Sequence, residues 1–290
     1  MSPISWVFNL DAEDELARPG SMTPPQRLRA RVALLTPQLG AFVGPGDRVI
    51  DEFALVRDSH KGTRGVAWCA TPRARRALAT AGARLGPAVP DPVLRRVNSR
   101  AFSAAILQGL PGAVFARSTR EVRAMVEALG GAPALCKRAL SHNARGRRRV
   151  RAPLAEADLY WIEKSLQESE GLQCEPEVER VDDWGLHGWL SPAGQLTRGA
   201  LTRQRIDPLG QWQASAQESA PELEAALSAT LSSVAEALVR EGYHGPFGID
   251  AFRYRGPQGV ALQPLSEVNA RFSMGFAAGF GDRLKSLLEE

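Results

Sequence analysis

Three polar residues alternate with apolar residues in the segment LSEVNARFSMG, late in the chain. They are a carboxylate, an amide and a guanidinium: Glu267, Asn269 and Arg271. Successive side chains of a β-strand point to opposite faces. We therefore expect these three side chains on one face of a strand, with Val268 and Ala270 on the other face in a core. Such a row would form one wall of a polar pocket.

A second carboxylate, Asp250, lies in the apolar run GPFGIDAFRY upstream of that segment. The short turn RGPQG between the two predicts a β-hairpin, which would bring Asp250 beside Glu267 and Asn269. A set of oxygen ligands suits Mg²⁺, an ion that keeps several waters and commonly bridges nucleotide phosphates. The alternative interpretation is an exposed hairpin with ordinary surface charges.

Charged residues farther upstream could complete a nucleotide site. Lys137 lies in the apolar run APALCKRAL, where a buried ammonium needs an anionic partner, and a phosphate would be one. Glu163 and Glu170 flank the stretch KSLQES, which we expect where a strand, ADLYWIEKSL, runs into a loop. Backbone groups there could bind a purine, and a carboxylate could accept ribose hydroxyls. The alternative is a charged loop without a ligand.

The remaining pattern predicts the elements that must position these residues. Ser118 and Glu121 form a capping box at the start of a helix that Gly130 ends, and APALCKRAL follows as a strand. A long helix is expected from Pro221 to Gly242. The stretch GLHGWLSPAGQLTRGALTRQRIDPLGQWQAS has the turn signals of β-hairpins. Near the N-terminal end, SWVFNL and GVAWCA predict strands, and TPRARRALATAGARLG predicts a helix.

The composition predicts a folded protein with more than one core. The chain has 290 residues, and a domain has about 150 residues as a loose expectation. Its hydrophobic content of 44% and charged content of 23% argue against extensive disorder. We expect two or three cores.

The net charge of +4 comes largely from arginines, notably in KRALSHNARGRRRVR. Such a cluster could hold phosphates, or it could be a solvated loop that contacts nucleic acid without specificity. The interleaved aromatic residues of a single-strand binder are missing from it.

The three cysteines, Cys69, Cys136 and Cys174, lack the spacing of a zinc site and predict buried thiols in a reducing compartment. The first residues turn acidic where a signal peptide would be basic and then apolar, and no stretch approaches about 18 uninterrupted apolar residues. We expect a cytoplasmic protein without membrane contacts. The four histidines are scattered, so we assign no nucleophile.

An acidic cluster, Asp11, Glu13, Asp14 and Glu15, follows the first predicted strand. Ligand sites of α/β proteins tend to lie at strand ends, so the cluster could receive an amine substrate. Acidic residues are also favourable in the first turn of a helix, which explains the cluster without a ligand.

The order of these features over roughly residues 95–280 resembles the ATP-grasp superfamily, whose carboxylate-amine ligases end in a Glu-x-Asn or Glu-x-Asn-x-Arg strand. The strongest part of the resemblance is GYHGPFGIDAF followed by EVNARF. The resemblance implies a fold of the α+β or α/β class, in which two α+β lobes sandwich ATP. A small α/β domain precedes these lobes in the sequence. The expected divisions are an N-terminal domain at 1–95, a first lobe at 96–164 and a C-terminal lobe at 165–290.

The resemblance also implies roles for the residues of the polar row. Asp250, Glu267 and Asn269 would hold Mg²⁺, or Mn²⁺, between the β- and γ-phosphates of ATP. Arg271 would face the transferred phosphoryl group or the acyl phosphate, and Lys137 would contact the α- and β-phosphates.

For the nucleoside, the resemblance implies that Glu163 lies by the adenine amino group and the backbone from Lys164 to Leu166 along the purine edge. Leu166 would pack on the ring, and Glu170 would bind the ribose hydroxyls. The phosphate-covering loop would be SHNARGRRR, with Arg145 and Gly146 in place of its usual glycine-rich end. This loop departs from the family pattern, because it has one glycine and four arginines. A second departure is Gly248, where some members have an arginine.

The implied activity is that of an ATP- and Mg²⁺-dependent ligase that activates a carboxylate as an acyl phosphate for attack by an amine or another nucleophile. Its partners would be ATP and small-molecule or peptide carboxylate and amine substrates, and neither a membrane nor nucleic acid is expected. The alternatives are a small-molecule kinase of the same fold and a non-catalytic module that binds nucleotides or nucleic acid. The apolar run MGFAAGF could pack in the core or in a homodimer interface.

Overall fold

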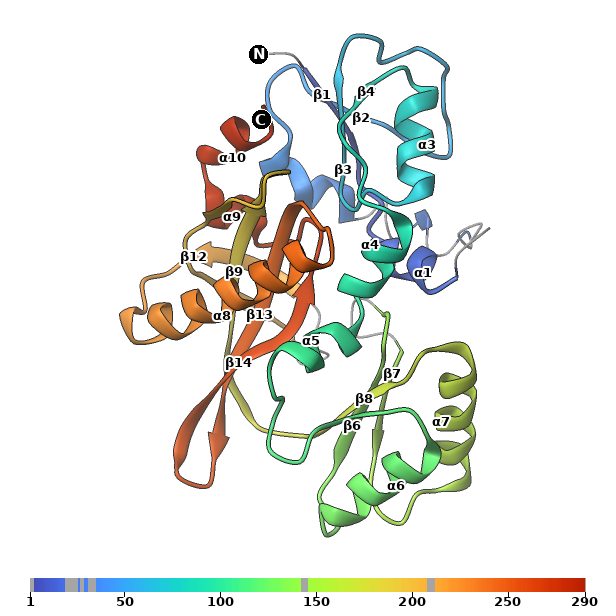
Figure 1. Cartoon of the computed structure of the whole chain (residues 1–290), viewed down its shortest axis with the longest axis vertical. Coiled ribbons are helices and arrows are strands. Elements are labelled where there is room, and N and C mark those ends of the chain that lie inside the picture. The colour runs from blue at the N-terminus through green and yellow to red at the C-terminus, as the bar shows by residue number, and fades with distance from the viewer. Residues whose placement is uncertain are drawn as a thin grey trace.

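The computed structural model describes residues 3–18, 26, 29–30, 35–141, 146–207 and 212–289. Its strands form a parallel four-stranded sheet, an antiparallel four-stranded sheet and an antiparallel six-stranded sheet, in that order along the chain. We call the three parts the N-terminal domain (3–90), the middle lobe (114–176) and the C-terminal lobe (180–289). In Figure 1 the N-terminal domain lies at the top and the middle lobe at the bottom.

The N-terminal domain has a parallel sheet in the order β2-β1-β3-β4. Its strands are β1 (Ile4–Val7), β2 (Arg48–Val49), β3 (Arg64–Ala67) and β4 (Arg84–Leu85), and its helices are α1 (Ala12–Ala17), η1 (Thr36–Phe42) and α3 (Pro72–Thr80). The strands predicted from SWVFNL and GVAWCA are confirmed. Helix α3 begins at Pro72 as predicted, but it ends before Gly86, because Gly82 adopts a φ of 80° and turns the chain toward β4.

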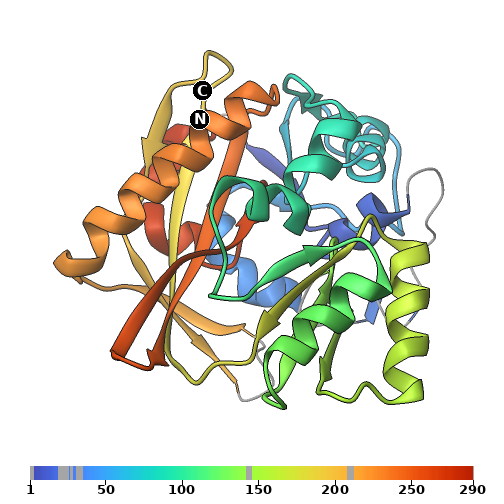
Figure 2. The same ribbon diagram turned by 60° about the horizontal axis from the view of Figure 1, so that its bottom comes forward.

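Two short helices, α4 (Asp91–Val97) and α5 (Arg100–Ile106), lead from the N-terminal domain to the middle lobe. The middle lobe has the strand order β5-β8-β6-β7. Its elements are β5 (Val114–Ala116), α6 (Thr119–Ala128), β6 (Ala134–Arg138), β7 (Arg147–Val150), α7 (Glu156–Glu168) and β8 (Leu172–Pro176). The capping box predicted at Ser118 and Glu121 is confirmed at the start of α6. Figure 2 shows α6 and α7 side by side on the middle lobe.

The prediction of a strand in ADLYWIEKSL was wrong, because this segment is helix α7. Its more buried positions recur with helical spacing, and Trp161, Ile162 and Leu166 pack into the core of the middle lobe. The boundary expected at residue 164 therefore falls inside a helix. The middle lobe continues through β8, which lies within its sheet between β5 and β6.

The C-terminal lobe has the strand order β12-β11-β9-β13-β14, with β10 paired to β9. Its strands are β9 (Arg180–Leu190), β10 (Leu196–Arg198), β11 (Thr202–Ile206), β12 (Trp212–Gln217), β13 (Gly245–Gly256) and β14 (Gly259–Asn269), and its helices are α8 (Pro221–Arg240), α9 (Phe276–Phe280) and α10 (Arg283–Leu287). The predicted hairpins and the long helix from Pro221 are confirmed. Helix α8 packs against β9, β13 and β14.

One hydrophobic core extends from the N-terminal domain into the C-terminal lobe, whereas the middle lobe has a core of its own. The ring of Phe272, after β14, lies 5.5 Å from that of Trp6 in β1, and the Phe272 amide donates to the Trp68 carbonyl over 3.0 Å. The run MGFAAGF places Phe276 and Phe280 in this shared core, where both rings are buried. That run therefore packs inside the chain and leaves these two rings unavailable to a dimer interface.

None of the described helices combines the length and the hydropathy needed to cross a bilayer. The three cysteines are free thiols and buried, as predicted.

Candidate active site

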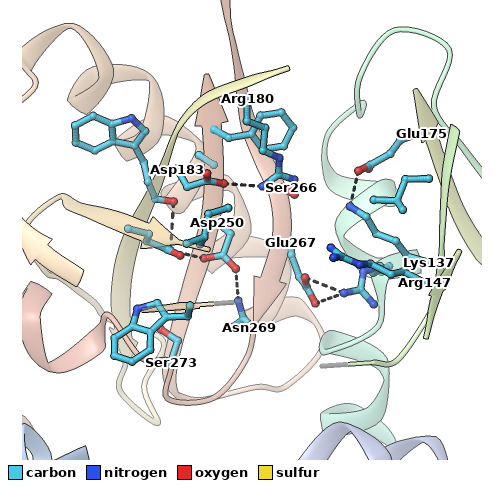
Figure 3. Close-up of a pocket in the computed structure, with 18 of the residues that line it drawn as sticks. Lys137, Arg147, Glu175, Arg180, Asp183, Asp250, Ser266, Glu267, Asn269 and Ser273 are labelled. Atoms are coloured by element: carbon cyan, nitrogen blue, oxygen red, sulfur yellow. Dashed lines mark hydrogen bonds and ion pairs between the residues drawn. The ribbon is translucent and has the colours of Figure 1, made fainter. Parts of the chain in front are cut away.

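A cavity of about 620 Å³ lies between the middle lobe and the C-terminal lobe. Its walls come from β6, β7 and the end of β8 on one side, and from β9, β11, β13 and β14 on the other. Figure 3 shows Lys137 and Glu175 facing Asp250, Glu267 and Asn269 across this space. The charged lining residues are Arg100, Lys137, Arg147, Arg149, Glu175, Glu177, Arg180, Asp183, Asp207, Asp250, Glu267 and Arg271.

The hairpin of β13 and β14 brings together the carboxylates and the amide that the sequence singled out. Asp250 pairs with Glu267 in the strand register, and Asn269 Nδ2 donates to Asp250 Oδ2 over 2.9 Å. The other Asp250 oxygen accepts from Gln204 Nε2 on β11 over 2.8 Å. Val268 and Ala270 lie in the core, each 1% exposed, so the predicted alternation is confirmed.

These three side chains have the chemistry of a magnesium site. Burial, and next the negative charge of Glu267, raise the pKa of Asp250 to about 6. A divalent cation would relieve the repulsion between the two carboxylates, and carboxylate and amide oxygens are ligands that Mg²⁺ accepts. Among the described residues, no three Asp, Glu, His or Cys side chains are grouped to hold a metal. The candidate set consists instead of two carboxylates and an amide.

Arg100 is a cavity residue that the sequence analysis missed. It is the first residue of α5, and its Nη2 donates to both Glu267 oxygens, each over 2.9 Å. A cation at the N-terminus of a helix opposes the helix dipole, so it is unfavourable there without an anionic partner. The available sequence signal for Arg100 was its position directly after Ser99, the N-cap of α5.

Lys137 extends from β6 into the cavity, as expected, but its partner there is a carboxylate. Its ammonium donates to Glu175 Oε1 on β8, and the two side chains are 14% and 12% exposed. Burial lowers the pKa of Lys137, and the charge of Glu175 opposes this effect. The buried ammonium is thus paired within the protein, and an incoming phosphate would have to compete with Glu175.

The structure does not bring the predicted nucleoside residues to the cavity. Glu163 and Lys164 lie on the exposed face of α7, and Leu166 packs in the core of the middle lobe. Glu170 accepts a hydrogen bond from Ser99 Oγ. None of the four lines the cavity. The error follows from the misassigned strand, because backbone groups inside a helix are already hydrogen-bonded to one another.

The segment that joins β8 to β9 lines the cavity in their place. Glu175 and Pro176 at the end of β8 line the cavity with Glu177 and Val178 of this segment and Arg180 of β9. The Arg180 guanidinium stacks 3.9 Å from the centre of the Phe252 ring and donates to Asp183 over 2.6 Å. Pro176 and Val178 give this connection between the two lobes an apolar lining.

The arginine-rich loop is described only in part. Arg145 lies outside the described residues, and Gly146, with a φ of 61°, accepts a hydrogen bond from the Arg138 amide over 2.8 Å. Alternation along β7 then directs Arg147 and Arg149 to the cavity, whereas Arg148 pairs with Asp158 of α7 over 2.6 Å.

Carboxylates accompany several of these arginines. Arg149 Nε donates to Glu177 over 2.5 Å, and Arg138, at the end of β6, donates to Glu168 over 2.8 Å. Their charge is therefore partly neutralised by the middle lobe itself. This arrangement disfavours the alternative in which the cluster forms a continuous cationic surface for nucleic acid.

Arg271 links the cavity to the acidic cluster of the N-terminal domain. It lines the cavity, and its guanidinium pairs with Glu13 of α1. Asp11 and Glu15 instead surround Arg73 of α3. Asp11, Glu13 and Glu15 are thus engaged with arginines and do not line the cavity, so the structure gives no support to a direct amine site there.

Gly248 makes room for a histidine beside the candidate metal ligands. A Cβ at this position would lie 2.9 Å from His187 Cδ2 of the paired strand β9, closer than real Cβ atoms approach other heavy atoms. His187 is fully buried, and burial lowers its pKa to about 3. Gly248, where the sequence departs from the ATP-grasp pattern, therefore lies against a neutral imidazole, that of His187.

The comparisons with known proteins agree with this architecture. No family model matches the sequence, and no curated protein matches it either. Many solved structures are similar. The D-cycloserine synthetase DcsG is 16% identical with a TM-score of 0.58, over 99% of this chain and 98% of that one. The protein has the ATP-grasp fold.

Two further ATP-grasp structures were solved with nucleotides. A biotin carboxylase-β-γ-ATP complex from Campylobacter jejuni is 12% identical with a TM-score of 0.59, over 98% of this chain and 70% of that one. An N5-carboxyaminoimidazole synthetase from Staphylococcus aureus complexed with ADP is 12% identical with a TM-score of 0.55, over 94% of this chain and 71% of that one. The mixed α/β ATP-grasp fold expected from the sequence is thereby confirmed.

Proposed function

We propose that this protein is an ATP- and Mg²⁺-dependent ligase that converts a carboxylate to an acyl phosphate and transfers the acyl group to an amine. One observation carries the proposal: Asp250, Glu267 and Asn269 face Lys137 across the cavity between the two lobes (Figure 3), and Arg100 lines the same cavity beside Glu267. Oxygen ligands for a divalent cation and cationic side chains for phosphates are the two requirements of phosphoryl transfer. The ATP-grasp fold and the nucleotide complexes of similar structures support it.

The nucleotide would lie between the lobes. Its phosphates would contact Lys137 and Arg100, and its base would lie against the connection from β8 to β9, with Val178 and Phe252 supplying apolar contacts. This replaces the nucleoside site expected from α7. Bound Mg²⁺, held by Asp250, Glu267 and Asn269, would neutralise charge on the phosphate oxygens.

In the reaction, an oxygen of the substrate carboxylate forms a bond to the γ-phosphorus as the bond to the β-phosphate oxygen breaks, which gives an acyl phosphate and ADP. The amine then attacks the acyl carbon, phosphate leaves, and the ammonium proton passes to solvent. Arg271 would face the transferred group, and Glu13 fixes its guanidinium beside the cavity. The contribution of these side chains is positioning and charge stabilisation.

Release of ADP during a screen of carboxylates and amines tests the activity. Glu267→Gln removes a metal ligand, so we expect turnover to fall by at least about 100-fold, the scale of a lost electrostatic contact in a transition state. The matched control is Glu163→Gln, the same change on the exposed face of α7. Equal rates for wild type and Glu267→Gln would contradict the assignment.

The kinase alternative is favoured by Arg147 and Arg149, which add cationic lining suited to a phosphorylated acceptor. Hydroxylamine separates the two reactions, because it converts an acyl phosphate to a hydroxamate and leaves a phosphate ester intact. Hydroxamate formation together with ADP would support the ligase. A stable phosphorylated product without hydroxamate would identify the kinase.

A further inference from the structure

Arg100, the first residue of α5, connects the end of β6 in the middle lobe to Glu267 on β14. Its Nη1 donates to the Arg138 carbonyl over 2.7 Å and to Ser141 Oγ over 2.8 Å. Its Nη2 donates to both oxygens of Glu267. The Arg100 amide donates to the Ala139 carbonyl over 2.9 Å. One residue thus joins the base of the arginine-rich loop to a candidate metal ligand.

The contact with Glu267 places Arg100 in competition with a metal ion. A guanidinium cannot lose its proton in the accessible pH range, so Arg100 stays cationic in this buried site. Both carboxylate oxygens of Glu267 are used by the same guanidinium nitrogen. A divalent cation on Glu267 needs one of those oxygens and repels the guanidinium at close range.

We propose that Arg100 and the metal ion exclude each other at Glu267, so that metal binding releases Arg100 from Glu267 to the nucleotide phosphates. This inference rests on the proposed function. Arg100 is then a positioning residue that couples two events: occupation of the metal site and binding of phosphates. The nucleotide and the metal therefore bind cooperatively. A metal ion that displaces Arg100 from Glu267 frees Arg100 for the phosphates, and phosphates that bind Arg100 free Glu267 for the metal.

The coupling can be measured with ATP in EDTA, without any metal. Glu267→Gln replaces the ion pair with Arg100 by a weaker, uncharged contact. We therefore expect the Glu267→Gln variant to bind metal-free ATP about 5- to 100-fold more tightly than wild type does, the usual range of a coupling between sites. Asp250→Asn is the matched control: it removes one negative charge from the same wall, but the Asp250 carboxylate accepts hydrogen bonds from Gln204 and Asn269 and not from Arg100 in the described structure. We expect a gain of less than about threefold from it.

The double variant Arg100→Gln with Glu267→Gln completes the cycle. The gain from Glu267→Gln should vanish when Arg100 is already replaced. A gain that persists in that background, or an equal gain from Asp250→Asn, would overturn the inference, because simple charge removal would then explain the affinity. The comparison of Glu267→Gln with Asp250→Asn decides the question even if Arg100→Gln does not fold.

Binding of ATP to the wild-type protein in excess Mg²⁺ distinguishes a failure of the Arg100 inference from a failure of the proposed ligase function. Binding of Mg²⁺-ATP without the selective gain for Glu267→Gln contradicts the role of Arg100 and leaves the ligase proposal in place. Absence of nucleotide binding with and without Mg²⁺ contradicts both.

Discussion

At the residue scale, the cavity is a set of mutually paired charges. Lys137 bonds to Glu175, Arg100 to Glu267 and Arg271 to Glu13. Each of these three cations therefore already has a carboxylate partner. Substrate phosphates would exchange with these carboxylates. The net gain from each exchange is therefore smaller than that of a phosphate binding to an unpaired cation.

His187 supplies a pH prediction at this scale. Its pKa is about 3 in the folded chain, against an ordinary 6.5, because burial disfavours the imidazolium. Between these values the unfolded chain binds a proton that the folded chain does not, so the free energy of unfolding falls as the pH drops below about 6.5. The slope from this group is at most about 1.4 kcal/mol per pH unit.

Urea unfolding of wild type and His187→Gln between pH 7 and pH 4.5 measures this contribution. The variant loses stability at every pH, but its unfolding free energy should fall less steeply with acid than that of wild type. Parallel curves would show that His187 does not titrate abnormally.

Residues in the hairpin were predictable, and Arg100 was not. Asp250, Glu267 and Asn269 lie on two strands joined by a short turn, so alternation and the turn alone place them together. Arg100 meets Glu267 across 167 residues of sequence. No local periodicity carries that information, because the contact depends on how α5 packs against β14.

At the element scale, α7 is the element whose type was predicted wrongly from the sequence pattern. A mixture of apolar and charged residues in ADLYWIEKSL fits a short strand or a helix, and only the longer register around it decides. That single misassignment placed the expected nucleoside site on a helix surface, away from the cavity. The hairpins and α8 were easier, because turn residues or a long apolar stripe set their limits.

Close packing of β9 against β13 gives a prediction for these strands. A Cβ at Gly188 would lie 2.5 Å from Cε1 and Cζ of Phe247, a fully buried ring. We expect Gly188→Ala to lower the free energy of unfolding by about 1–3 kcal/mol, as overpacking does. Gly86→Ala, where nothing lies within 4 Å, is the matched control and should change stability little. Equal denaturation midpoints for the two variants would contradict the packing described for these strands.

At the scale of the whole molecule, a shared core joins the N-terminal domain to the C-terminal lobe, and the middle lobe has a core of its own. A smaller cluster lies between α3 and the sheet of the N-terminal domain. The sequence predicted two or three cores from length, but it could not reveal that two parts share one. The aromatic contacts of Phe272 with Trp6 and Trp68 join segments more than half the chain apart.

Hydrogen exchange tests this division. Phe272→Ala should cost about 3–5 kcal/mol and speed amide exchange in β1 and β3 as well as in β13 and β14, with little change in α6. Ile162→Ala, in the core of the middle lobe, should cost about 2–5 kcal/mol and speed exchange in α6 and β6. Faster exchange throughout the chain in both variants would contradict two separate cores.

The most direct test of the account is thermal unfolding with ATP and Mg²⁺. Ligand at about 100 times its dissociation constant should add about 2.7 kcal/mol to the free energy of unfolding. We expect wild type and Glu163→Gln to show this Mg²⁺-dependent stabilisation, and Glu267→Gln to lose most of it. Absence of a shift in wild type, or an equal shift in Glu267→Gln, would contradict a nucleotide and metal site between the two lobes.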